Sequence, residues 1–276
     1  MFRCFSFWVL LFILFYDTRY IIEKTMKNLS GYKAVILAGG KGTRLYPITK
    51  EIPKPLLPIN KKPIINYLVD LFGQYGIREI AVLINKNFKQ DFEWWKKRYY
   101  PSVSSGRVLN IRLVEEKEEL GTFGGIYFLK DWIGRSKFFL TNGDELKKID
   151  LVKMAEFHNQ VKPLGTIALV QVPDPQHYGV VVCNSVKVKD FLEKPEPAQI
   201  LEKFQAGKNP VVNAGLYLLN PEIINYHPGP EFLMIEKDIF PKLAKEDKLA
   251  GFKFKGKWTD CGTWERYEKA LSDWQS

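Results

Sequence analysis

A glycine-rich segment is the part of the chain whose residue types and spacing most clearly suggest chemistry. Gly39, Gly40 and Gly42 come directly after the apolar run at residues 33–38 (KAVILA). Glycines let backbone amides approach a phosphate closely, and α/β sheets bind ligands at the ends of buried parallel strands. Glycine-rich turns also serve as plain connections, so the glycines alone only suggest a phosphate-binding loop.

Two cations follow the glycines at close range and favour a phosphate site over a plain connection. Arg44 offers a planar fork of N–H donors, and Lys54 is a point charge on a backbone stiffened by Pro53 and Pro55. Transfer of a phosphoryl or nucleotidyl group requires positive charge around the reacting phosphorus. An exposed loop lysine is the ordinary alternative for Lys54, but beside this loop we predict a catalytic role for Lys54 and Arg44.

A carboxylate stands at the end of another apolar run. Asp144 closes the segment FFLTNGD at residues 138–144, which would deliver it to the ligand-binding edge of a parallel sheet. Magnesium takes oxygen ligands, usually one or two carboxylates together with substrate phosphates. A turn aspartate is the alternative, and we favour Asp144 as a catalytic residue and a Mg²⁺ ligand.

The elements that must position these residues alternate in type. Buried strands are predicted at 33–38, 79–84, 110–114 and 137–140, and helices at 63–72, 91–100 and 122–132. This alternation indicates a mostly parallel sheet with helical crossovers. The second half favours a mixed sheet with strands at 166–172, 178–184 and 211–219, followed by helices at 232–243 and 264–274. The fold class is therefore α/β, with a Rossmann-like, mostly parallel or mixed sheet flanked by helices.

Composition sets the broad class of the protein. The 276 residues are 46% hydrophobic and 26% charged, which suits one globular domain, placed at 31–276. The net charge of +10 comes from scattered lysines and arginines, so a nucleic-acid partner is not expected. Cys4, Cys183 and Cys261 lie far apart, which argues against a disulfide framework or a zinc site and fits the reducing cytoplasm.

The first 30 residues form an apolar extension with two interpretations. Residues 5–16 (FSFWVLLFILFY) resemble the hydrophobic core of a signal or anchor, but the run is shorter than the roughly 20 residues of a spanning helix. Alternatively, translation begins at Met26, and this interpretation is slightly favoured. The expected location is cytoplasmic, with membrane association only through residues 5–16 if that segment is genuine.

Residues 37–59, LAGGKGTRLYPITKEIPKPLLPI, resemble the sugar-phosphate nucleotidyltransferases. This family includes glucose-1-phosphate thymidylyl- and uridylyltransferases and mannose-1-phosphate guanylyltransferases. The resemblance continues from Tyr32 to the C-terminus and implies a nucleotide-diphospho-sugar transferase fold that binds an NTP and a hexose 1-phosphate. It further implies that Arg44 binds the leaving pyrophosphate, that Lys54 steadies the reacting phosphates, and that Asp260 is a second Mg²⁺ ligand beside Asp144.

The same resemblance assigns nucleotide contacts to the glycine loop and to two other glycines. Leu120-Gly121-Thr122 is similar to a family loop that lies near the base, although Phe123 stands where a small residue is expected. The predicted nucleotide-binding residues are Leu37, Ala38, Gly39, Gly40, Gly42, Thr43, Gly121 and Gly143.

Three segments of the second half are similar to the family's sugar-binding region. Glu193 and Asn213 are expected to hydrogen-bond sugar hydroxyls, Gly179 to let the backbone approach the ring, and Lys194 to neutralise the sugar phosphate. Taken alone, Glu-Lys-Pro is usually an exposed turn and Asn-Ala-Gly a strand start. Their order after the preceding motifs is what favours a binding role.

The predicted activity joins a sugar 1-phosphate to an NTP with Mg²⁺, giving an NDP-sugar and pyrophosphate. A catalytically silent homologue that binds NDP-sugars and regulates a partner is the alternative, and the presence of Arg44, Lys54, Asp144 and Asp260 argues against it. A membrane glycosyltransferase would suit the apolar N-terminus but would have no use for the glycine loop. The base, the sugar and the oligomeric state, including a homo-oligomer, stay open.

Overall fold

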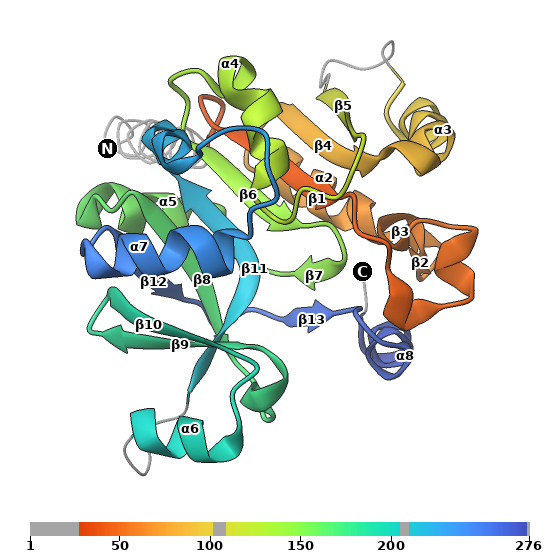
Figure 1. Cartoon of the computed structure of the whole chain (residues 1–276). Coiled ribbons are helices and arrows are strands. Elements are labelled where there is room, and N and C mark those ends of the chain that lie inside the picture. The colour runs from red at the N-terminus through yellow and green to blue at the C-terminus, as the bar shows by residue number, and fades with distance from the viewer. Residues whose placement is uncertain (1–27, 102–108, 205–209, 275–276) are drawn as a thin grey trace, which may run out of the picture.

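The structure is a computed structural model that describes residues 28–101, 109–204 and 210–274. In this part of the chain a nine-stranded sheet runs in the order β5-β4-β1-β6-β11-β8-β12-β10-β9 and helices cover it (Figure 1). The N-terminal residues 1–27, which hold the apolar run at 5–16, lie outside the described residues. None of the described helices combines the length and apolar character needed to cross a membrane.

The first half of the sheet is parallel. Strand β1 pairs with both β4 and β6, and β4 pairs with β5. The strands are β1 (Lys33–Ala38), β4 (Glu79–Asn85), β5 (Asn110–Glu116) and β6 (Phe138–Asn142). The connecting helices are α2 (Ile64–Gln74), η4 (Lys86–Phe88), α3 (Lys89–Tyr99), η5 (Gly124–Leu129) and α4 (Lys130–Ile133). Parallel strands bring their carboxyl ends to one edge, so the residues after β1, β5 and β6 meet there.

The second half of the sheet is mixed and partly closed. Strand β11 runs antiparallel to β6 and β8, and β9 pairs with both β10 and β11, so β8, β12, β10, β9 and β11 form a closed ring. The strands are β8 (Gly165–Gln171), β9 (Gly179–Asn184), β10 (Lys187–Glu193), β11 (Val211–Leu219) and β12 (Leu249–Lys253). The helices are α5 (Leu151–Val161), η6 (Pro175–His177), α6 (Pro197–Lys203), η7 (Pro221–Tyr226), η8 (Ile235–Ile239) and α7 (Phe240–Lys245).

Strand β1 shows how the core forms on both faces of the sheet. Ala34 and Ile36 pack into a cluster with Phe72 of α2, whereas Val35 packs into a second cluster with Phe123 and the residues of η5. Successive side chains of a strand point to opposite faces, and both faces of this strand are covered. This explains why its sequence is continuously apolar and not alternating.

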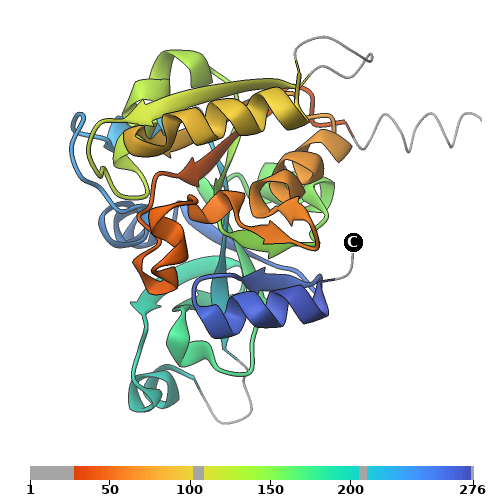
Figure 2. The same ribbon diagram turned by 90° about the vertical axis from the view of Figure 1, so that its right-hand side faces the viewer.

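A third, smaller cluster holds the segment that follows the glycine loop. Leu45 and Leu57 pack there against Cys261 and Trp274 from the end of the chain. The elements concerned are η1 (Thr43–Leu45), η2 (Ile48–Lys50), η3 (Lys54–Leu56), β2 (Pro58–Ile59), β3 (Lys62–Pro63), β7 (Glu145–Lys147), β13 (Trp258–Asp260) and α8 (Trp264–Asp273). Figure 2 shows the orange segment beside the blue helix α8, so this cluster fixes Arg44 and Lys54 relative to Asp260.

Every strand expected from the sequence is present, and the α/β fold class is confirmed. Two predicted helices are wrong in part. Residues 122–132 form a 3-10 turn and only then α4, because Gly124 and Gly125 disfavour an α-helix. The helix predicted at 232–243 begins at Ile235 with a π turn before α7. Helices α5 and α6 and strands β2, β3, β7, β10, β12 and β13 were not predicted from the sequence.

Candidate active site

The glycine loop turns sharply after β1 because Gly42 adopts a left-handed backbone with φ of 64°, a conformation that other residues rarely take. Thr49 Oγ1 donates a hydrogen bond to the Gly42 carbonyl at 2.8 Å. A Cβ on Gly42 would also lie 3.1 Å from the Thr49 side chain. The turn places Thr43 and Arg44 of η1 over the carboxyl end of the sheet.

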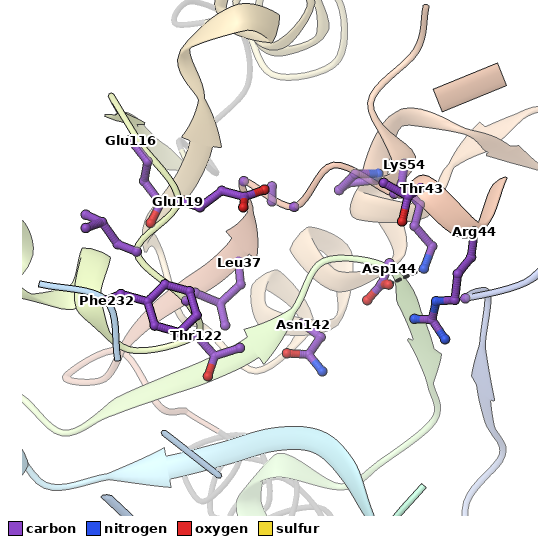
Figure 3. A pocket seen from close by; sticks show the side chains of 18 residues that line it. Leu37, Thr43, Arg44, Lys54, Glu116, Glu119, Thr122, Asn142, Asp144 and Phe232 are labelled. Carbon is purple, nitrogen blue, oxygen red and sulfur yellow. Dashed lines mark hydrogen bonds and ion pairs between the residues drawn. The ribbon is translucent and has the colours of Figure 1, made fainter. Parts of the chain in front are cut away.

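A cavity of about 410 Å³ opens at this edge, and its wall includes most of the predicted nucleotide contacts. The predicted residues in the wall are Leu37, Ala38, Gly39, Gly40, Gly42, Thr43 and Gly121. Gly143 is not in the wall; its amide donates to the Leu37 carbonyl at 2.9 Å. We call this space, shown in Figure 3, the first cavity.

A second cavity of about 290 Å³ adjoins the first, and its wall includes all four residues predicted to bind the sugar phosphate: Gly179, Glu193, Lys194 and Asn213. Lys194 has a left-handed φ of 47°, which is uncommon for a lysine and occurs mainly where the surrounding structure imposes it. Its amide donates to the Tyr178 carbonyl at 3.1 Å. The tight turn after β10 thus presents the lysine at the cavity.

The two cavities share Arg44, Asn142 and Asp144. In Figure 3, Arg44, Lys54 and Asp144 gather at one end of the first cavity, and Glu116 and Phe232 lie at the other. One end of the first cavity is therefore cationic and borders the second cavity. A ligand that carries phosphates would place them at this shared end.

Lys54 and Asp144 form an ion pair at the shared end, drawn as a dashed line in Figure 3. The Lys54 side chain is only 7% exposed. Burial alone would raise the pKa of Asp144, but Lys54, with Lys147 and Arg44, outweighs burial and lowers the pKa. Asp144 is therefore a carboxylate at neutral pH.

Asp260 lies in the wall of the second cavity and is also held by a cation. Arg266 contacts Asp260 Oδ2, and its guanidinium stacks over the Tyr178 ring with 4.6 Å to the centroid. A Cβ on Gly262 would lie 2.5 Å from Asp260 Oδ1 and 3.2 Å from Arg44 Nη2. Gly262 is thus a point of close approach between the predicted metal ligand and the predicted pyrophosphate ligand.

The two aspartates in the wall of the second cavity form a donor set that fits magnesium. Asp144 and Asp260 both face the second cavity, and each contacts its cationic partner through Oδ2, so each has a second oxygen to offer. Within the described residues no group of three or more His, Cys, Asp or Glu side chains could hold a metal ion. Two carboxylates completed by substrate phosphates are the usual arrangement for Mg²⁺.

Glu145, next to Asp144, is a buried structural carboxylate that the sequence did not single out. Its Oε1 accepts from Asn142 Nδ2 at 2.8 Å, and its Oε2 accepts from Lys147 Nζ and Trp258 Nε1, each at 2.8 Å. Burial raises its pKa despite Lys147. Because these donors converge on Glu145, it orients Asn142 in the wall that the cavities share.

A chain of hydrogen bonds connects the two cavities on another side. Thr122, in the wall of the first, donates to Glu236 Oε2 at 2.6 Å, and Tyr217 Oη donates to Glu236 Oε1 at 3.0 Å. Asn213 Nδ2, in the wall of the second, donates to Tyr217 Oη at 2.8 Å. Glu236 itself faces the second cavity from the π turn η8, a kind of irregularity that often marks functional sites. The loop expected near the base is thereby tied to the predicted sugar contact.

Phe123, which departs from the pattern of similar sequences, does not enter the first cavity. Its ring is fully buried and lies 5.4 Å from the His227 ring, centroid to centroid. The bulky residue fills the core beneath the loop, and Gly121 and Thr122 keep their places in the wall.

Sequence reasoning missed Glu116, Glu145, Glu236 and Arg266 as site residues. Glu116 could have been recognised from its position, because it ends a parallel strand at the same edge as Gly39 and Gly143. Glu145 could have been recognised in the same way, because it follows Asp144 directly. Glu236 and Arg266 could not, since only the packing of η8 and α8 brings them to the cavities.

Comparison with known proteins assigns the family. The family model described as nucleotidyl transferase matches residues 33–276. The chain belongs to this nucleotidyl transferase family. The family assignment confirms the resemblance found in the glycine-loop segment.

Individual members of the nucleotidyl transferase family resemble the chain over most of its length. Mannose-1-phosphate guanyltransferase of Schizosaccharomyces pombe is 34% identical over 236 residues, which cover 83% of this chain and 61% of the relative. A probable glucose-1-phosphate cytidylyltransferase of Bacillus subtilis is 29% identical over 256 residues, or 88% of this chain and 96% of the relative. The chain thus spans about three fifths of the length of the mannose-1-phosphate guanyltransferase.

Solved structures of the family have the same fold. The crystal structure of HddC from Yersinia pseudotuberculosis complexed with GMP-PN superimposes with a TM-score of 0.67 at 28% identity. The match covers 88% of this chain and all of HddC (100%).

Proposed function

We propose that this nucleotidyl transferase joins a sugar 1-phosphate to the α-phosphate of a nucleoside triphosphate and releases pyrophosphate. The observation that carries this proposal is the pair of cavities that meet at Arg44, Asn142 and Asp144. The first has glycines and cations suited to a triphosphate, and the second has an amide, carboxylates and Lys194 suited to a sugar phosphate. The names of the relatives describe the transfer of nucleotides to hexose 1-phosphates, and this supports the same reaction here.

In the proposed mechanism an oxygen of the sugar phosphate attacks the α-phosphorus in line, and the bond to the β-phosphate breaks. The attacking phosphate is already an anion at neutral pH, so no general base is required, and pyrophosphate leaves with the bonding electrons. Catalysis then depends on positioning and on stabilising negative charge. Lys194 holds the incoming phosphate, Lys54 steadies the reacting α-phosphate, and Arg44 binds the departing pyrophosphate.

Magnesium is the proposed cofactor, and Asp144 and Asp260 are the residues that would hold it. When bound, it neutralises charge on the phosphate oxygens. The protein's own part is to hold both carboxylates in position. Lys54 does so for Asp144, whose pKa it also lowers, and Arg266 contacts Asp260.

The test is release of pyrophosphate by the full chain with each common NTP, Mg²⁺ and a panel of hexose 1-phosphates. Release that requires both an NTP and one sugar phosphate supports the proposal and names the substrates. A folded protein that binds an NDP-sugar but releases no pyrophosphate from any pair contradicts it. That outcome would favour a silent regulatory homologue instead.

A further inference from the structure

Glu116, the last residue of β5, is a buried carboxylate in the wall of the first cavity. It is 9% exposed, and its Oε1 is the one buried side-chain nitrogen or oxygen of the described residues without a hydrogen-bond partner. An unpaired buried polar group costs about 1–3 kcal/mol, and more when it is charged. The molecule keeps an acceptor here that its own residues do not satisfy, which points to donors from a ligand.

Two glycines make the room that this carboxylate occupies. A Cβ at Gly39 would overlap Glu116 Oε2, and a Cβ at Gly125 would overlap Glu116 Oε1. Neither glycine has a left-handed backbone, so no special φ explains the lack of a side chain there. The absence of side chains at both positions leaves the carboxylate in its place at the cavity.

The position of Glu116 identifies the part of a nucleotide that it would meet. In Figure 3 it lies with Phe232 and Leu37 at the end of the first cavity opposite Arg44, Lys54 and Asp144. A nucleoside triphosphate with its phosphates among the cations has its base at the other end. Phe232, which is exposed and lines the same end, offers a ring against which a base can stack.

We propose that Glu116 selects guanine, with its two oxygens accepting hydrogen bonds from the N1–H and the exocyclic amino group of the base. This proposal rests on the proposed function, which assigns the phosphates of the nucleotide to the cationic end of the first cavity. An ionised carboxylate is an acceptor only, and guanine alone among the common bases presents two adjacent N–H donors on one edge. Adenine and cytosine pair one donor with a ring-nitrogen acceptor, and uracil and thymine flank one N–H with two carbonyls.

The electrostatic surroundings of the Glu116 carboxylate also favour a ligand that brings hydrogen-bond donors. Burial, with a smaller contribution from Glu119, raises the pKa of Glu116 to about 7. Glu119 forms an ion pair with Lys41 at 3.1 Å. Gly39 and Gly125, which lie against the Glu116 carboxylate, have no charged side chain that could stabilise it. Two N–H donors from a base would stabilise the ionised carboxylate of Glu116. Guanine therefore supplies the hydrogen bonds that the protein's own residues do not provide.

The test is direct binding of GTP, ATP, CTP, UTP and dTTP, each with Mg²⁺ and without sugar phosphate, to the parent chain and to Glu116→Gln. Gln keeps the size of the side chain but replaces one acceptor with a donor. We expect the parent to bind GTP most tightly. We expect Glu116→Gln to weaken GTP binding about tenfold to a hundredfold, the range of a bidentate contact to a base, with little change for the other nucleotides.

Glu115→Gln is the matched control, because Glu115 neighbours Glu116 on β5 but is exposed and paired with Lys89. It should change GTP affinity by less than about threefold, as expected for an exposed ion pair. A thermal unfolding curve establishes that each variant is folded. An equal loss of affinity for all five nucleotides in Glu116→Gln, or a parent that prefers another base, overturns the inference.

The same measurements separate this inference from the proposed function. Selective GTP binding that Glu116→Gln abolishes, in a protein that releases no pyrophosphate with any sugar phosphate, upholds the role of Glu116 and contradicts the proposed reaction. Release of pyrophosphate with a pyrimidine nucleotide alone upholds the reaction and contradicts guanine selection.

Discussion

Lys54 contacts Asp144, which lies 90 residues further along the chain, through an ion pair at the boundary of the two cavities. The lysine follows the glycine loop, and the aspartate follows β6, the strand next to β1. Lys54 lies in the wall of the first cavity alone, whereas Asp144 belongs to both. The pair therefore stands where a triphosphate and a sugar phosphate would meet.

Replacing Lys54 by alanine should lower kcat by about 100- to 1,000-fold, the usual effect of removing one preorganised donor to a transition state. It also removes the cation that keeps the pKa of Asp144 low. Steady-state kinetics of pyrophosphate release measure the effect. Lys41→Ala, which removes an exposed lysine of the same loop, should leave kcat within about threefold of the parent, and a Lys54→Ala enzyme of near-normal turnover would contradict the assigned role.

Glu116→Gln should stabilise the fold at pH 8 and not at pH 4.5. The pKa of Glu116 is raised from 4.5 to about 7 by burial and by Glu119, so the folded state binds more protons than the unfolded state between these values. Stability of the parent therefore falls as the pH rises through this window. Urea unfolding should show a gain for the variant of up to about 3 kcal/mol at pH 8, and a variant less stable than the parent at pH 8 would show that the carboxylate has a partner.

Tyr217→Phe should impair use of the sugar phosphate more than use of the nucleotide. The hydroxyl is fully buried and joins Asn213 to Glu236, so its loss leaves both partners short of one hydrogen bond and costs about 1–3 kcal/mol. We expect KM for the sugar 1-phosphate to rise about tenfold. Tyr226→Phe, whose hydroxyl contacts the exposed Glu246 at 2.6 Å, should leave KM unchanged, and an equal rise of both KM values in Tyr217→Phe would refute a role confined to the sugar side.

Asp144→Asn and Asp260→Asn should each raise the Mg²⁺ concentration for half-maximal activity by at least about tenfold. Both substitutions keep the shape of the side chain and remove a negatively charged oxygen ligand. Titration of Mg²⁺ after treatment with a chelator measures the change. Asp131→Asn, an exposed position on α4, should leave the titration unchanged, and activity of the parent in excess chelator would exclude a metal requirement.

The fold was predictable because its strands are buried on both faces and follow one another with helices between them. The apolar runs at 33–38 and 79–84 predicted the bounds of β1 and β4 to within one residue. Helix α6 had a recognisable start that the prediction did not use: Glu196 at the N-cap and Gln199 at the third helical position form a capping box, with Pro197 as the first helical residue. The short strands β7 and β13 had no recognisable sequence pattern. They pair with each other in a separate two-stranded sheet and are not part of the main sheet.

The candidate site was predictable where local sequence determines it. Gly42 needs its left-handed turn, and Arg44 and Lys54 follow it at close range, so the glycines together with these two cations indicated a phosphate site from the sequence. Glu116 was missed because the predicted strand ended at Val114, whereas β5 continues to Glu116 itself. Glu236 and Arg266 depend on contacts more than 50 residues away in the chain, to Thr122 and Tyr178, which no local pattern encodes.

The wall that the two cavities share has a consequence for inhibition. A ligand that spans both cavities must pass Arg44, Asn142 and Asp144, and it then occupies the places of both substrates at once. The two halves of such a ligand are covalently joined, so the second binds at a high effective concentration once the first is seated. The NDP-sugar product of the proposed reaction has this shape, and a non-hydrolysable bisubstrate compound built on it would compete with either proposed substrate from a single binding event.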